Sequence, residues 1–166
     1  MVSATSLTGA AGEHFVMSQF LRRGLIAALA PAGVPNCDIV VTDDVGDRAF
    51  AVQVKTRRNL GTDGGWHMSK KHEQLASPNL FYCFVDIGRE ASDHPTVFVV
   101  PAPIVADVLT RAHRAWLAKP GKGGKPHNDT DFRRFLPDYS HLGLEDLGSG
   151  WLEQYRGNGA WDRLKG

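Results

Sequence analysis

The sequence has no hydrophobic run long enough to cross a membrane, few cysteines and almost no excess of either charge. Its longest apolar stretch, Leu25–Val34, is interrupted by Pro31 and Gly33 and falls short of the roughly 18 residues that a membrane span needs. The first residues carry neither the charged start nor the apolar block of a secretory signal. We therefore expect a soluble, cytoplasmic protein without a membrane partner.

The scarcity of cysteine and of net charge excludes two further classes of protein. Cys37 and Cys83 are too few for a disulfide framework, so we expect reduced thiols in a cytoplasmic protein, with one bridge between them as the alternative. The 19 Lys and Arg against 18 Asp and Glu give a net charge of +1, which excludes a polycation. Any basic surface that binds a nucleic acid must therefore be local.

The chain does have the length and apolar content of one folded domain. Its 166 residues are 42% hydrophobic and 22% charged, close to the average for globular proteins. We expect a single domain over residues 1–166, with a core over 8–118 and a loop and mainly helical extension over 119–166. Trp151 and Trp161 in that extension are candidates for a dimer or partner surface, although core packing is the commoner role of tryptophan.

The order of the predicted elements indicates an α/β fold. Apolar residues at helical spacing predict helices, which we place after Thr8, after Pro103, over Asp131–Leu136 and over Gly143–Tyr155. Runs of β-branched and aromatic residues predict four strands, at Cys37–Thr42, Arg48–Thr56, Leu80–Ile87 and Thr96–Val100. The polar, glycine-rich stretch Arg57–Lys71 predicts a loop or the start of a short helix. We expect a mixed central β-sheet flanked by helices.

Polar residues interrupt the second predicted strand at an unusual place. Gln53 and Lys55 are two residues apart between valines, so both side chains project from the same face of the strand. A hairpin with the first strand brings Asp38 towards the same end of the sheet. Because a central strand is covered on both faces, these polar groups need partners there. The alternatives are an exposed sheet face for Gln53 and Lys55, and a simple turn role for Asp38.

Glu13 adds a second carboxylate to this set. It lies on the apolar face of the first helix, which indicates that it points at the sheet, although a solvated acid at the start of a helix is the alternative. Oxygen ligands from Glu13, Asp38 and Gln53 suit a hard divalent cation, Mg²⁺ or Mn²⁺. An adjacent Lys55 can orient a water molecule or hold an anionic oxygen.

These residues, in this order, resemble the PD-(D/E)xK nuclease superfamily over about residues 8 to 110. The likeness rests on Gly12-Glu13 in the first helix, on Asp38 at a strand start, and on Gln53-Val54-Lys55 fifteen residues later. In overall order the chain is similar to archaeal Holliday-junction resolvases and small restriction-type endonucleases. Gln53 departs from the usual Asp or Glu, and a Gln-x-Lys also occurs in some transposon and homing endonucleases of the superfamily. The proline of the family name is displaced as well.

The resemblance implies a restriction-endonuclease-like core and a divalent-metal-dependent endonuclease that acts on duplex or branched DNA as a homodimer. It implies that Glu13, Asp38 and Gln53 hold the metal and that Lys55 assists the attacking water. The neutral Gln53 removes one negative charge, so weaker Mg²⁺ affinity is expected. The alternative is a catalytically inactive domain that only binds a nucleic acid or a protein partner.

A basic segment follows the candidate catalytic strand. Residues 55–72 hold five Lys or Arg against one acid, and a nucleic-acid backbone would run beside this strand. We expect phosphate contacts from Arg57, Arg58, Lys70 and Lys71, with a solvated loop as the alternative. The same segment, together with the rest of the chain, shows no spacing typical of a zinc site.

Overall fold

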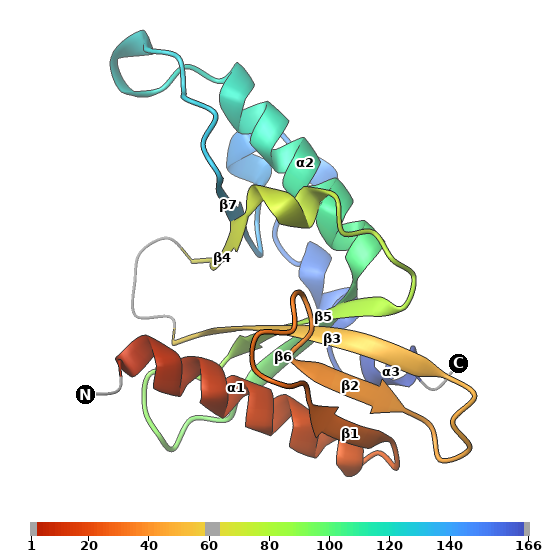
Figure 1. The fold of residues 1–166 in the computed structure, drawn as a ribbon. Helices are drawn as coiled ribbons and strands as arrows, with labels where there is room; N and C mark the ends of the chain where they lie inside the picture. Colours follow the sequence, from red (N-terminus) through yellow and green to blue (C-terminus); the bar gives the residue numbers. More distant parts are fainter. Residues whose placement is uncertain (1–2, 59–63, 165–166) are drawn as a thin grey trace.

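A five-stranded β-sheet forms the centre of the computed structural model, which describes residues 3–58 and 64–164 (Figure 1). The strands lie side by side in the order β1 (Ile26–Leu29), β2 (Ile39–Thr42), β3 (Ala49–Arg57), β5 (Leu80–Asp86) and β6 (Thr96–Pro101). β3 and β5 run parallel, and all other neighbours run antiparallel. The predicted α/β class, with a mixed central sheet flanked by helices, is confirmed.

Two helices cover one face of the sheet. α1 (Ala4–Leu21) and α3 (Asn158–Asp162) place Val16, Phe20 and Trp161 in one buried cluster with Val52 and Val54 of β3. The rings of Phe20 and Trp161 meet edge to face at 5.0 Å. Each Å² of apolar surface that is buried stabilises the fold by roughly 25 cal/mol. This burial holds α1 and α3 against the same side of the sheet.

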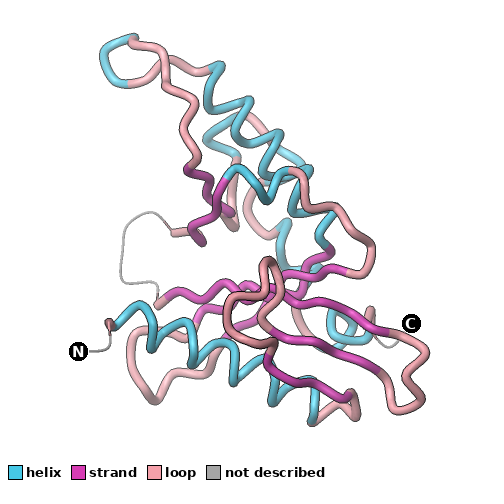
Figure 2. Tube along the Cα trace, in the orientation of Figure 1, coloured by secondary structure: helices cyan, strands magenta, loops and turns pink. Residues whose placement is uncertain are grey.

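The other face is covered by α2 (Ala102–Ala118) and by a second, two-stranded sheet of β4 (Trp66–Ser69) and β7 (Phe132–Phe135). Figure 2 shows these two strands separate from the main sheet and beside α2. Phe135 of β7 stacks on Phe84 of β5 with ring centroids 4.0 Å apart. Short 3₁₀ helices complete this layer, at Lys70–Glu73 (η1), Lys122–Gly124 (η2), Ser140–Leu142 (η3), Glu145–Leu147 (η4) and Trp151–Tyr155 (η5).

The start of the chain differs from the prediction in two ways. The first helix begins four residues before Thr8, because the Ser3 side chain accepts the amide hydrogen of Ser6 and caps it. It ends at Leu21, and Gly24 turns the chain with a φ of +79°. Ile26–Leu29 therefore form β1 rather than a continuation of the helix.

The prediction of a helix over Asp131–Leu136 is wrong, because Phe132–Phe135 form strand β7. Arg133 and Phe135 are buried and Phe132 is exposed, which is the two-residue period of a strand. Its partner β4 lies in a stretch predicted as a loop or helix start. Gly143–Tyr155 contain only 3₁₀ turns, so the extension over 119–166 is less helical than expected.

The tryptophans of the C-terminal third pack inside the molecule. Trp151 and Trp161 are both buried, one in each of the two apolar clusters on either side of the sheet. They are core residues, which was the commoner of the two predicted roles, and neither offers a surface to a partner. In the described ranges, no helix combines the length and apolar character that a membrane span requires.

Candidate active site

Asp38 and Gln53 meet at the point where β2 begins. The antiparallel register places Asp38 opposite Gln53, and the Asp38 amide donates to the Val52 carbonyl at 2.8 Å. Oδ2 of Asp38 accepts hydrogen bonds from Nε2 of Gln53 and from the Val54 amide, the latter at 2.7 Å. Because β2 is shorter than β3, the Asp38 carboxylate supplies Val54 with the acceptor that a longer strand would provide. Gln53, only 8% exposed, thus has the partner that its position required.

Lys55 projects from the same face of β3, one step beyond Gln53. In the parallel register with β5, Gln53 lies beside Tyr82 and Lys55 beside Phe84. Burial lowers the pKa of Lys55, the charge of Asp38 opposes that shift, and the charge of Lys71 adds to it. The ammonium group is therefore less hydrated than a surface lysine and lies in the field of the Asp38 carboxylate.

Glu13 approaches this cluster from the other side of the sheet. α1 packs on the face of β3 that carries Val52 and Val54, so Glu13 does not share a face with Lys55. Burial raises the pKa of Glu13, and the charge of Asp38 raises it further. β3 extends beyond the start of β2 and leaves that edge of the strand open, so the two carboxylates interact past the start of β2.

Gly12 sets how closely the helix approaches the strand at this point. A Cβ atom at Gly12 would lie 1.9 Å from Oγ1 of Thr56, so no larger residue fits without movement of α1. Oγ1 of Thr56 is itself buried and has no hydrogen-bond partner within residues 3–58 and 64–164. The close contact carries Glu13, the next residue, towards the end of β3.

The oxygen donors of this cluster are of the chemical type that a magnesium or manganese ion takes. In the part of the chain that the structure describes, no three His, Cys, Asp or Glu side chains gather into a metal-binding group. Mg²⁺, however, is commonly held by one or two carboxylates, with waters and substrate phosphates completing its shell. Burial, and after it the charge of Asp38, raises the pKa of Glu13, and a cation beside these two carboxylates would offset both effects. The Gln53 amide meets Asp38 through Nε2 and also carries an oxygen of the kind that Mg²⁺ takes.

A buried polar pair lies next to Gln53 and Lys55 and was not predicted. Nδ1 of His72 and Oη of Tyr82 are 2.7 Å apart, and His72 is only 2% exposed. Burial lowers the pKa of His72 to about 4, with further contributions from Lys55 and Lys71. Tyr82 is the only hydroxyl-bearing residue in the apolar run Leu80–Val85, and that was the signal available in the sequence.

The four predicted phosphate ligands differ in what they contact. The Arg57 guanidinium lies over the Trp66 ring at 4.0 Å and forms an ion pair with Asp86 at 3.0 Å. Lys70 pairs with Asp129 at 2.9 Å. Arg58 is exposed and donates to the Arg89 carbonyl, whereas Lys71 is exposed and has no ion-pair partner among the described residues.

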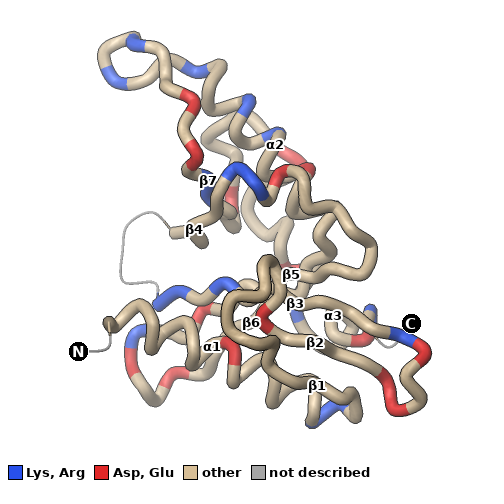
Figure 3. Tube along the Cα trace, in the orientation of Figure 1, with Lys and Arg blue, Asp and Glu red and all other residues tan. Residues whose placement is uncertain are grey.

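Basic residues gather at the end of β3 and in the segment after β4 (Figure 3). The electrostatic influence of Lys71 on Lys55 and on His72 places η1 near the candidate site. Of the four predicted ligands, Lys71 is the one whose charge lowers the pKa of Lys55.

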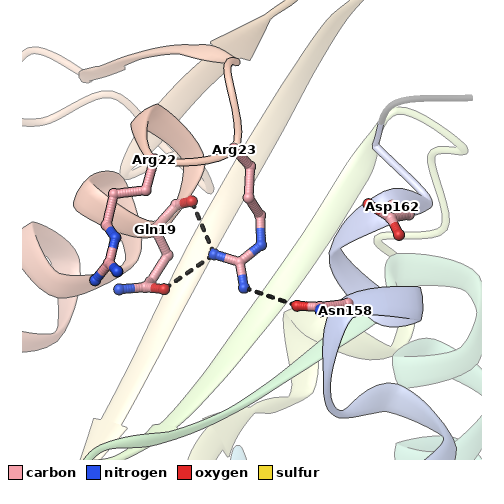
Figure 4. Close-up of a pocket in the computed structure, with 5 residues that line it drawn as sticks. All are labelled: Gln19, Arg22, Arg23, Asn158 and Asp162. Carbon is pink, nitrogen blue, oxygen red and sulfur yellow. Dashed lines mark hydrogen bonds between the residues drawn. The ribbon is translucent and has the colours of Figure 1, made fainter.

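A separate polar pocket of about 580 Å³ lies at the opposite end of α1 (Figure 4). Arg23 donates there to Gln19 at 2.9 Å and to Asn158 at 3.3 Å, and its guanidinium lies over the Trp161 ring. These contacts join α1 to α3. None of the predicted site residues lines this pocket.

Two nucleases are among the solved structures to which the chain is similar. No protein-family model and no curated protein matches the chain. The chain is similar to a bacterial homing endonuclease (17% identity, TM-score 0.46, 63% of this chain and 70% of that chain). It is also similar to a Holliday junction resolvase from the archaeon Archaeoglobus fulgidus (18% identity, TM-score 0.44, 85% of this chain and 96% of that chain).

Proposed function

We propose that the protein is a divalent-metal-dependent endonuclease that hydrolyses phosphodiester bonds in DNA. The observation that carries this proposal is the row of Asp38, Gln53 and Lys55 on one face of the sheet, with the Glu13 carboxylate close enough to feel the charge of Asp38. Carboxylates, an amide and a partly dehydrated ammonium are the groups that phosphodiester hydrolysis uses.

Each group has a distinct role in the proposed reaction. Glu13, Asp38 and the oxygen of Gln53 would hold Mg²⁺ or Mn²⁺, and such an ion supplies stabilisation of the negative charge that develops on the phosphate. Lys55 donates hydrogen bonds to the attacking water or to a phosphate oxygen. Its lowered pKa reflects a poorly hydrated ammonium, which interacts more strongly with an anion than a fully solvated one does.

The proposed substrate is duplex or branched DNA, bound by phosphate contacts and cut by a homodimer. Lys71 and Arg58 are exposed and lie on segments that adjoin the candidate site. Arg57 and Lys70 would have to share their carboxylate partners with a phosphate. A cytoplasmic location is consistent with the two free thiols.

Cleavage of supercoiled plasmid and of a four-way junction, with Mg²⁺, Mn²⁺ or EDTA, tests the proposal. We expect metal-dependent cutting that Asp38→Ala and Lys55→Ala reduce by at least about 100-fold, because each removes a charged group from the reacting centre. The matched control is Asp44→Ala, which removes an exposed acid from the turn between β2 and β3. Equal activity in all three variants would refute the site assignment.

Binding without cleavage is the second candidate function. Gln53 stands where the superfamily pattern has an acid, and this favours a site that has lost its chemistry. Under this alternative, calorimetry detects no Mg²⁺ or Mn²⁺ uptake, while DNA binding remains sensitive to salt. Metal uptake that disappears in Asp38→Ala would rule it out.

A further inference from the structure

A small cavity of about 160 Å³ lies between the second half of α2, β7 and η3, and none of the candidate site residues lines it. Leu109 and Tyr139, each 1% exposed, form its floor, and Phe132, which is 50% exposed, stands at its mouth. A cavity of about 150 Å³ with apolar walls holds one benzene ring. The size of this cavity therefore fits a single planar ring, and it is too small for a drug-sized ligand.

The walls of this cavity combine aromatic rings with polar groups. Trp116 stacks on His127 with ring centroids 3.9 Å apart and on His113 at 5.4 Å, and the first contact fixes the segment after α2 to the helix. His141 and Thr130 also line the cavity and carry groups that can exchange hydrogen bonds with a ligand. Apolar walls with a few polar groups suit a ring that bears nitrogen and oxygen atoms.

The surroundings of the cavity are positively charged. Of the described residues that line it, none is acidic, and Arg134 contributes a guanidinium. Residues 119–127, which follow α2, hold three lysines and no acid (Figure 3). The first of them, Lys119, donates to the carbonyl of His141 at the edge of the cavity. A ligand that joins a planar ring to negative charges therefore complements the cavity and its rim.

Ion pairs connect this surface to the segment beside the candidate active site. Oδ1 of Asp129 lies 2.9 Å from Nε2 of His113, and Oδ2 pairs with Lys70 of η1 at 2.9 Å. The next residue of η1 is Lys71, whose charge lowers the pKa of Lys55. α2 and β7 cover the face of β5 that carries Tyr82 and Phe84, the same face from which Lys55 projects. The cavity therefore lies on the same side of the main sheet as Lys55, and η1 links the two.

We propose that this cavity binds one unpaired pyrimidine base of a DNA strand, with the adjoining phosphates held by Arg134 and the lysines of residues 119–125. The choice of DNA rests on the proposed function. Bases stack on aromatic side chains, and an unpaired base can enter a pocket without the cost of leaving a duplex. The protein therefore favours DNA with a single-stranded tail or gap, whereas a four-way junction with every base paired gains nothing from this site.

Fluorescence anisotropy in EDTA, which removes the metal that the proposed cleavage requires, tests the binding of a base. Three labelled duplexes are compared: one fully paired, one with a short thymine tail, and one with an abasic tail of the same length. The abasic tail keeps the phosphates and lacks the bases, so it separates base binding from attraction of charge. We expect the thymine tail to bind about 10-fold more tightly than the abasic tail, the scale of one stacked base.

Two variants locate the bound base. Ala112→Leu fills the cavity from α2, and Phe132→Ala removes the ring at its mouth, so each should abolish the preference for thymine over the abasic tail. Val45→Ala truncates a side chain that is 71% exposed in the turn between β2 and β3, and this matched control should keep the preference. If circular dichroism shows that Ala112→Leu is unfolded, Phe132→Ala decides, because its side chain is half exposed.

The outcomes separate this inference from the proposed function. Equal affinity for the thymine and abasic tails, no binding to any of the three DNAs, or a preference that survives in both cavity variants would overturn the base site. A preference for the thymine tail in a protein that never cleaves DNA with Mg²⁺ refutes the nuclease and leaves the base site standing. Cleavage without that preference does the reverse.

Discussion

At the scale of single residues, Gln53 is the position that most affects the charge of the candidate site. It is buried against Asp38, and a glutamate there would place two carboxylates in contact. Without metal, Gln53→Glu should lower the melting temperature by about 4 °C because like charges repel. Mg²⁺ should raise that temperature more in the variant than in the unmodified chain, since a divalent ion gains a third negative ligand.

Differential scanning fluorimetry with and without Mg²⁺ checks this prediction. Gln74→Glu serves as the control, because Gln74 is exposed at the end of η1 and a carboxylate there meets water. An equal Mg²⁺ response in Gln53→Glu and Gln74→Glu would show that Gln53 does not adjoin a metal.

His72 makes stability depend on pH between its ordinary pKa and its value in the fold. The pKa falls from 6.5 in a free side chain to about 4 in the folded protein, chiefly through burial. Between these values the unfolded chain binds a proton that the folded chain does not, so the free energy of unfolding falls as the pH falls. We expect the free energy of unfolding to fall by roughly 2 kcal/mol from pH 7 to pH 4.5. Solvent screening makes this loss smaller than the full pKa shift would give.

Urea unfolding at pH 7 and at pH 4.5 measures this loss. His72→Gln should be less stable at pH 7, because the hydrogen bond with Tyr82 is changed, and it should lose less stability on acidification. The same acid sensitivity in both proteins would assign the effect to other groups.

The polar residues of the site could be found from the sequence because they are out of place. Gln53 and Lys55 interrupt an apolar strand, and a buried amide needs a partner, which proved to be Asp38. The side from which Glu13 approaches was not predictable. That placement depends on which face of the sheet α1 covers, and the helix period does not specify it.

At the scale of elements, the contact between α1 and β3 depends on Gly12. Gly12→Ala would drive Cβ into Thr56, so the helix must shift from the sheet, and we expect a loss of about 1–3 kcal/mol of stability. Because Glu13 moves with the helix, Mg²⁺ affinity should fall as well. Chemical denaturation and calorimetric titration measure the two effects.

Gly9→Ala is the matched control for this prediction. Gly9 lies in the same helix, and a Cβ there would meet no atom within 4 Å. Alanine should therefore stabilise the protein by about 0.5–1 kcal/mol through its better helix propensity. Equal effects at the two glycines would contradict a role for close packing.

Sequence reasoning missed three of the four strands that are four residues long, and it found only β2 among them. β1, β4 and β7 are too short to show a period of two, and each depends on a partner elsewhere in the chain. β4 and β7 are separated by more than 60 residues of sequence, so no local pattern links them. The longer strands β3 and β5 were predicted within a residue or two, because their apolar runs are strong enough to stand alone.

At the scale of the whole molecule, the proposed binding of DNA by a nearly neutral chain requires a local cluster of positive charge. Lys71→Ala should reduce the slope of log affinity against log salt concentration by about 0.9, the value of one phosphate contact. Arg114→Ala removes an exposed cation from α2 and should leave the slope unchanged. Fluorescence anisotropy with labelled duplex DNA at several salt concentrations gives both slopes, and an equal loss in the two variants would indicate diffuse attraction.

The division of the chain at residue 118 stays a prediction. Residues beyond it contribute to both sides of the main sheet, since Leu152 lies in one apolar cluster and Leu164 in the other. Arg156 also bridges Phe98 on the outer edge of β6. Arg156 therefore pairs with that edge, whereas in the part of the chain that the structure describes no strand pairs with the outer edge of β1.

The two cysteines are unequally buried, so their thiols differ in how readily a reagent reaches them. Cys83 is fully buried in β5, and burial raises its pKa far above that of a free thiol. Cys37 is half-buried beside Asp38, and its thiol donates to the Ile39 carbonyl. An alkylating reagent should therefore label Cys37 and not Cys83. Because Cys37 lies directly beside the candidate site, a ligand that binds there should change the rate of labelling.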